Sequence, residues 1–280
     1  AARSGVLWGK DLVFTHGPLG FLHPAAGVTP GSAWRFLAGQ VLLGALGSGM
    51  AAALFAQLDR RARTLLCAYL VVFHATLWAD TLWIVLFGAT ACAVALQLEH
   101  QTRGRMLYVL LCAFGAYAAV VSLIKLSLLP LAGATWAAIL VMCLAARRLG
   151  EAATALIAFP ASLLIVWWLC GQSVSNLPGF ATGFLQISGG YSSAMSAGAP
   201  IPVEIGGAVV LAVLVASLVL WAWRQRRHAQ GLALLACLSI ALLLGWKAGF
   251  TRADAHTMTF FGVAAGISLL ILAVPCRQST

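Results

Sequence analysis

The segment GKDLVFTHGPLGFL at residues 9–22 places three polar side chains, Lys10, Asp11 and His16, among apolar neighbours. Such a setting is typical of a segment held at a membrane surface. A carboxylate that is partly shielded from water holds its proton more tightly, which suits a general base. We therefore expect Asp11 to be a catalytic base, with Lys10 and His16 as substrate contacts. A hydrated Asp beside a Lys that extends into water explains the same pattern without any function.

A second polar segment, WKAGFTRADAHTMTFF at residues 246–261, lies between two apolar stretches. Lysine and arginine can neutralise a phosphate or diphosphate, arginine by a two-point contact. An aspartate there can orient a histidine or bind a sugar hydroxyl. The alternative is a hydrated loop between helices. The expected substrate contacts in this segment are Lys247, Arg252, Asp254 and His256.

A stretch of about 35 residues at 171–205, rich in Gly, Ser and Ala, is longer than a helix connection needs. Loops of this length often bind ligands or act as lids, and Tyr191 within it can stack on a sugar. A loop without function is the alternative. Lys125, at another turn, is expected to be a second phosphate contact, although a helix-end lysine reaching for water explains it equally well. His74 and Asp80 are expected to pair in a structural role.

Composition requires lipid as the solvent for this chain. Of its 280 residues, 62% are hydrophobic and 9% charged, and the mean hydropathy is +0.96. A bilayer core asks for about 20 apolar residues per helix, so the repeated apolar runs predict an all-α, polytopic transmembrane bundle. We expect spans at about 36–57, 64–78, 81–98, 106–123, 127–145, 152–170, 206–223, 231–247 and 258–275.

The arginines decide the orientation of these spans. They cluster in alternate links, which the positive-inside rule assigns to the cytoplasm. All three lysines then fall on the outer face, where an anionic ligand explains them better than membrane orientation does. Residues 1–34 are expected to form an extracytoplasmic interfacial segment and residues 35–280 the membrane domain. The chain begins without Met and without a signal peptide, so we expect an upstream helix. The cytoplasmic arginines are Arg60, Arg61, Arg63, Arg103, Arg105, Arg147, Arg148, Arg224, Arg226, Arg227 and Arg277.

The remaining patterns exclude several functions. The net charge of +10 follows from the link arginines, so no nucleic-acid partner is expected. The seven cysteines show no CxxC or Cys/His spacing, which argues against disulfides and a zinc site. No nucleotide-binding or hydrolase motif is present. We expect no cofactor and no metal.

An acidic residue in the first outer segment, many spans and basic groups on later outer turns resemble the GT-C class of membrane glycosyltransferases. The segments KDLVFTHGPLGFL and KAGFTRADAHTMTFF also resemble parts of large bacterial membrane proteins. The resemblance implies a location in the bacterial inner membrane and a polyprenyl-phosphate or diphosphate sugar as the donor. It also implies that Asp11 is the base, with lysine or arginine contacting the phosphate.

The sequence is also consistent with three other functions. A flippase or transporter would carry ionisable groups near the middle of its spans, where this chain has almost none. A carrier-dependent ligase or polymerase would also use outer Arg and His residues. An assembly scaffold predicts that replacing Asp11, Lys247 and Arg252 changes nothing.

Overall fold

A computed structural model describes residues 6–12, 14–24, 30–76, 79–100, 104–194, 198–225, 229–251, 253 and 255–273. This part of the chain is helical and contains no strand beyond isolated bridges. Four short 3-10 helices occur in this part of the chain. One of them, η1 (Gly20–Leu22), lies in the N-terminal segment, and η3 (Pro30–Ser32), η4 (Leu126–Leu128) and η5 (Val174–Asn176) each directly precede an α-helix. The α-helices are α1 (Ala33–Phe55), α2 (Arg60–Thr76), α3 (Ala79–Glu99), α4 (Arg105–Ile124), α5 (Leu129–Ala145), α6 (Leu149–Leu169), α7 (Leu177–Ala194), α8 (Ile201–Gln225), α9 (Ala229–Phe250) and α10 (Thr257–Ala273).

Seven of the described helices are long and apolar enough to cross a bilayer: α1, α3, α4, α5 with η4, α6, α8 and α9. The helix α10 is also apolar but shorter. The expected all-α, polytopic bundle is therefore confirmed. The nine expected spans overlap α1–α6 and α8–α10, but α2 is not among the described helices long and apolar enough to cross a bilayer, so seven of the nine meet that criterion. The stretch 171–205 differs from the expected loop, because it contains η5 and α7 before α8 begins.

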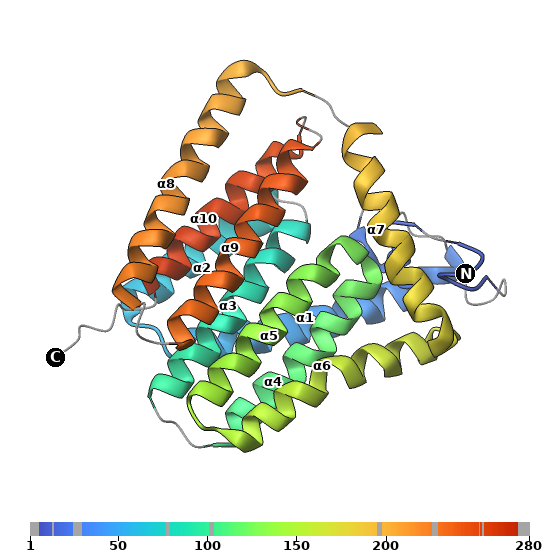
Figure 1. The fold of residues 1–280 in the computed structure, drawn as a ribbon, viewed down its shortest axis with the longest axis horizontal. Helices are drawn as coiled ribbons and strands as arrows, with labels where there is room; N and C mark the ends of the chain where they lie inside the picture. Colours follow the sequence, from blue (N-terminus) through green and yellow to red (C-terminus); the bar gives the residue numbers. More distant parts are fainter. Residues whose placement is uncertain are drawn as a thin grey trace.

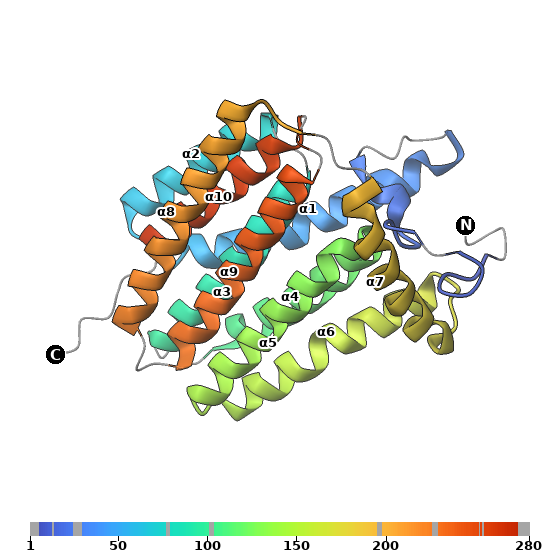
Figure 2. The same ribbon diagram turned by 45° about the horizontal axis from the view of Figure 1, so that its top comes forward.

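The helix connections gather at two ends of the bundle (Figures 1 and 2). One end carries the α1–α2, α3–α4, α5–α6 and α8–α9 connections, and the described link arginines belong to it. The other end carries the N-terminal segment, the α2–α3, α4–α5 and α9–α10 connections, and α7 (Figure 1). This alternation agrees with the order of sides that the arginine clusters indicate, so the second end is called the outer end.

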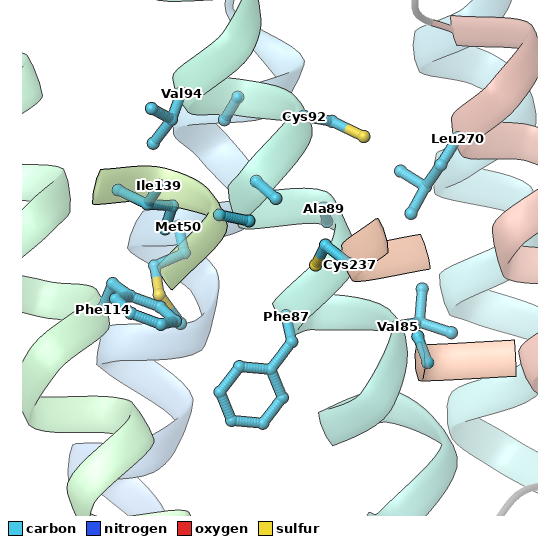
Figure 3. Packing of buried hydrophobic residues seen from close by; sticks show 14 of the residues in the cluster. Met50, Val85, Phe87, Ala89, Cys92, Val94, Phe114, Ile139, Cys237 and Leu270 are labelled. Carbon is cyan, nitrogen blue, oxygen red and sulfur yellow. The ribbon is translucent and has the colours of Figure 1, made fainter. Parts of the chain in front are cut away.

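The central helix of the bundle is α3, most of which is buried against α1, α5, α9 and α10. Small side chains allow these neighbours to approach, as they commonly do between helices in membranes. A β-carbon added at Gly88 would lie 3.1 Å from a methyl carbon of Leu238 and 3.2 Å from one of Leu270. Figure 3 shows this packing around Phe87, Ala89 and Cys92 of α3.

The helices α4 and α6 make the closest backbone approach among the described spans that a glycine permits. A β-carbon added at Gly115 would lie 2.6 Å from the carbonyl carbon of Ala158 and 2.7 Å from its oxygen. Pro160 lies inside α6, two residues after this contact. Because a proline cannot donate a helical hydrogen bond, it leaves a carbonyl of the preceding turn without that partner. The fit between α4 and α6 thus depends on the absence of a side chain at residue 115.

Candidate functional site

The N-terminal segment is fastened to the outer end of α4 by backbone hydrogen bonds. The N–H of Gly17 donates to the carbonyl of Ile124 at 3.2 Å, and the N–H of Leu126 donates to the carbonyl of Thr15 at 3.0 Å. A β-carbon at Gly17 would lie 2.4 Å from the carbonyl oxygen of Leu123, so only glycine fits this approach. His16 and Lys125, which are 109 positions apart, consequently form a bridge of two residues.

A buried ion pair lies at this junction. The ammonium of Lys125 contacts Asp80 Oδ2, and His23 Nε2 lies 3.4 Å from the other oxygen, Oδ1. Asp80 occupies the first turn of α3, where the exposed N–H groups of a helix stabilise a negative charge. The side chain of Asp80 is 11% exposed and that of Lys125 25% exposed, which leaves little water to solvate the carboxylate. Lys125 and His23 therefore supply most of its stabilisation.

His16 is the fourth member of this cluster and is only partly buried, whereas His23 is buried. Its ring lies 5.2 Å from the ring of His23, at nearly a right angle, and stacks on Phe14 with 5.8 Å between centroids. The ring of His23 in turn packs edge-on against Trp83. Burial lowers the pKa of His16, His23 and Lys125 lower it further, and Asp80 opposes them. A neutral His16 imidazole, which can accept a proton, is thus favoured near pH 7.

Acidification is expected to weaken the attachment of the segment through His16. Its pKa lies below its ordinary value of 6.5 in the folded protein, so protonation favours the unfolded chain. Stability is then retained above about pH 6.5 and is lost as the pH falls below it. Unfolding in detergent at pH 7.5, 6.5 and 5.5 should show a smaller acid-induced loss for His16→Gln than for the parent. His100→Gln, an exposed histidine at the other end, is the control. An unchanged acid-induced loss in His16→Gln would contradict this assignment.

Two hydroxyl groups adjacent to the ion pair in sequence are buried without a hydrogen-bond partner among the described residues. Thr81 Oγ1 belongs to the residue after Asp80, and Ser122 Oγ to a residue three positions before Lys125. Buried polar atoms in proteins are almost always hydrogen-bonded, so these two hydroxyl groups are unusual for a packed core. The described residues contain no group of three His, Cys, Asp or Glu side chains that could hold a metal ion. The charge on Asp80 is compensated by the ammonium group of Lys125.

Asp11 lies on a separate part of the same segment. Residues 7–12 form a tight turn in which Gly9 has a φ of +83° and the Asp11 carboxylate accepts the N–H of Leu7 at 2.9 Å. Both Asp11 and Lys10 are exposed. The shielding of Asp11 that the apolar neighbours suggested is therefore not found. Its Oδ1 accepts no hydrogen bond from a described residue.

The 7–12 turn is held by the corner between α6 and α7. The N–H of Trp8 donates to Gln172 Oε1 at 2.8 Å, and the indole of Trp8 packs edge-on against Phe180 with 6.1 Å between centroids. Trp167, which is fully buried, packs against the other side of this cluster. The helix α7, which the sequence did not predict, thus positions the segment that carries Asp11.

The 246–261 segment lies elsewhere on the outer end. Lys247 occupies the last turn of α9, and His256 precedes α10. In Figures 1 and 2 this connection lies apart from the N-terminal segment that carries Asp11. Arg252 and Asp254 lie outside the described residues, as does the side chain of Tyr191, whose backbone belongs to α7.

Of the predicted site residues, the structure brings together His16 and Lys125. Asp80 pairs with Lys125 and His23, and its expected pairing with His74 stays a prediction, because the side chain of His74 lies outside the described part of the chain. His23 was not predicted. Its signal was a histidine between Leu22 and Pro24, in a charge-poor chain, seven positions after His16.

The arrangement of the helices defines the chain as a multi-pass helical membrane protein with a polar cluster at its outer end. Comparison with family models, curated proteins and solved structures found no match to this chain. Its function therefore has to be inferred from the chemistry of the site.

Proposed function

We propose that this protein is a GT-C-like glycosyltransferase that moves a sugar from a polyprenyl-phosphate or diphosphate carrier to an acceptor on the outer side of the membrane. The observation that carries the proposal is an exposed carboxylate, Asp11, beside an exposed ammonium, Lys10, on a segment fastened over the end of an apolar bundle. A carrier lipid remains in the bilayer, so its headgroup lies at the membrane surface, where this proposal places the segment.

The residues suit the two requirements of the reaction. The acceptor hydroxyl gives its proton to Asp11, and its oxygen forms a bond to the anomeric carbon. The bond between that carbon and the carrier phosphate oxygen breaks, and the electron pair leaves with the phosphate. Lys10 stabilises the negative charge that develops there. His16, half-buried and favoured as a neutral imidazole, can donate a hydrogen bond to the same phosphate.

We assign Lys125 a role other than the phosphate contact that the sequence suggested. Its ammonium is already paired with Asp80, and a second anion would have to compete with that carboxylate. We assign Lys125, Asp80 and His23 to positioning the segment. Lys247 and His256, on a separate connection, are not part of this proposed site.

A flippase is the principal alternative. The ion pair between Asp80 and Lys125 is the observation that bears on it most directly. Transporters place ionisable groups near the middle of broken helices. Asp80 lies in the first turn of α3 and Lys125 directly follows α4, so this pair lies at helix ends. The position of the pair favours a surface reaction over passage through the bundle.

The test is sugar transfer by the full chain in proteoliposomes, supplied with polyprenyl phosphates that carry radiolabelled sugars. Asp11→Asn should lower the transfer rate by about 100-fold or more, because a positioned base contributes roughly that much. Asp59→Asn is a matched control, since Asp59 is also exposed and also accepts a backbone N–H, that of Ala62 at 2.7 Å. Parental transfer by Asp11→Asn would refute the base. Movement of the donor across the bilayer without transfer would indicate a flippase.

A further inference from the structure

An open pocket of about 370 Å³ lies at the opposite end of the bundle from the candidate site. It is formed where α4 begins and where α5 turns into α6. Gly104, Tyr108, Arg147, Arg148, Leu149 and Glu151 line it.

The two arginines of this pocket differ in their exposure and in whether they form an ion pair. The guanidinium of Arg148 is partly buried and donates from Nε to Glu151 Oε1 at 2.9 Å, with a second contact from Nη2 to the same oxygen. The guanidinium of Arg147 is exposed and makes no ion pair or hydrogen bond with any described residue. Because Glu151 is neutralised by Arg148, the pocket retains one uncompensated positive charge, on Arg147.

The backbone at Arg147 adds to the contrast. Its φ is +56°, the left-handed region that favours glycine, and no other described non-glycine residue has a positive φ. An arginine is thus held where a glycine would fit the turn more easily. The turn alone gives no reason for a charged side chain here.

Neutral hydrogen-bond donors complete the pocket. The hydroxyl of Tyr108 makes no hydrogen bond with a described residue, and a β-carbon at Gly150 would lie 2.6 Å from it. Neither Gly104 nor Arg148, which precede α4 and α6, caps its helix with a side chain, so first-turn N–H groups are left for other acceptors. A phosphate oxygen can accept hydrogen bonds from a guanidinium, a tyrosine hydroxyl and a backbone N–H group alike.

The surroundings of the pocket are apolar and exposed. Leu149, within the lining, is 70% exposed, and Met106 and Val109 on the neighbouring part of α4 are 62% and 61% exposed. In a membrane-spanning bundle such side chains face acyl chains. A ligand that joins a phosphate to acyl chains would use both the cationic and the apolar features.

We propose that this pocket binds the phosphate of an anionic ligand through Arg147 and Tyr108, with an anionic phospholipid headgroup as its occupant. The arginine clusters assign this end to the cytoplasmic side, and basic pockets between helices on that side commonly receive such headgroups. This site is independent of the proposed transferase reaction.

The test uses the full chain in phosphatidylcholine nanodiscs, with and without phosphatidylglycerol, and native mass spectrometry of the lipid that each protein retains. Arg147→Gly should reduce phosphatidylglycerol retention by about tenfold or more, because a charge-assisted contact is lost. The same variant should fold, because glycine suits the φ of this position. Tyr108→Phe, which keeps the ring, should give a smaller loss.

Arg61→Ala is the matched control, because Arg61 is an exposed arginine at the same end but outside the pocket. A second arm adds inorganic phosphate to nanodiscs that contain phosphatidylcholine alone. An Arg147-dependent rise in the unfolding midpoint in that arm, without retention of phosphatidylglycerol, would assign the site to a soluble phosphate. Parental retention by Arg147→Gly with no effect of inorganic phosphate, or an equal loss in Arg61→Ala, would overturn the proposal.

Discussion

Replacing Lys125 with methionine is expected to lower the free energy of unfolding by about 3 kcal/mol. Removing one member of a buried ion pair leaves the other charge without compensation, which typically costs about 3–5 kcal/mol. The lower end applies here, because the Lys125 side chain is a quarter exposed. The loss should appear in the midpoint of unfolding by SDS in mixed micelles. It should also release the N-terminal segment, since that segment is hydrogen-bonded to the residues around Lys125.

The physical cause can be separated from simple loss of a side chain. In the double variant Asp80→Asn/Lys125→Met no buried charge is left unpaired, so about half or more of the lost stability should return. Lys10→Met, at an exposed lysine of the same segment, should change the unfolding midpoint little. If the double variant were less stable than Lys125→Met, the charge of Asp80 would not be the source of the effect.

Adding one methyl group at Gly115 is expected to destabilise the protein by about 2 kcal/mol, within the range for overpacked sites. The new β-carbon would lie 2.6 Å from the backbone of Ala158, and a backbone atom cannot move aside as the end of a side chain can. The helices α4 and α6 would have to separate. Thermal unfolding of Gly115→Ala in detergent measures the effect.

Gly49→Ala is the matched control for this change. Gly49 also lies within a spanning helix, α1, but has open space where its β-carbon would be. Alanine is favoured over glycine in a helix by about 1 kcal/mol, so this variant should be unchanged or more stable. If Gly115→Ala lowers the stability and Gly49→Ala does not, the contact between helices, and not helix propensity, determines the effect at Gly115. Equal effects would contradict the role of Gly115.

The separation of Asp11 from Lys247 reduces the set of residues in the proposed transferase site. The sequence placed both on the outer side and grouped them at one cavity, but Asp11 belongs to the N-terminal segment and Lys247 to the last turn of α9, and these two elements lie apart in Figures 1 and 2. The proposed reaction therefore relies on Lys10 and His16, which share a segment with Asp11. Transfer that survives replacement of Lys247 is consistent with this smaller site.

Hydrophobicity along the chain was sufficient to predict the membrane class and most of the long apolar helices, whereas the side on which each connection lies stays a prediction from the arginine clusters. Each apolar run must bury its backbone in a helix wherever it meets lipid, so these features follow from local composition. The helix α7 was missed for the same reason. Its Gly and Ser residues carry little helical signal, and its formation depends on Phe180 and Phe184 packing against Trp8 and Trp167.

Only the tertiary structure decided which charges meet. His16 and His23 lie far in sequence from Asp80 and Lys125, and nothing in local spacing distinguishes their partners from His74 or Lys247. The close approach at Gly17 brings the N-terminal segment against the end of α4, and the low exposure of that junction means that the charge of Asp80 needs a nearby cation. Sequence composition thus determined that the chain lies in a membrane, whereas the packing of distant segments determined its polar cluster, because electrostatic partners are selected by distance in space.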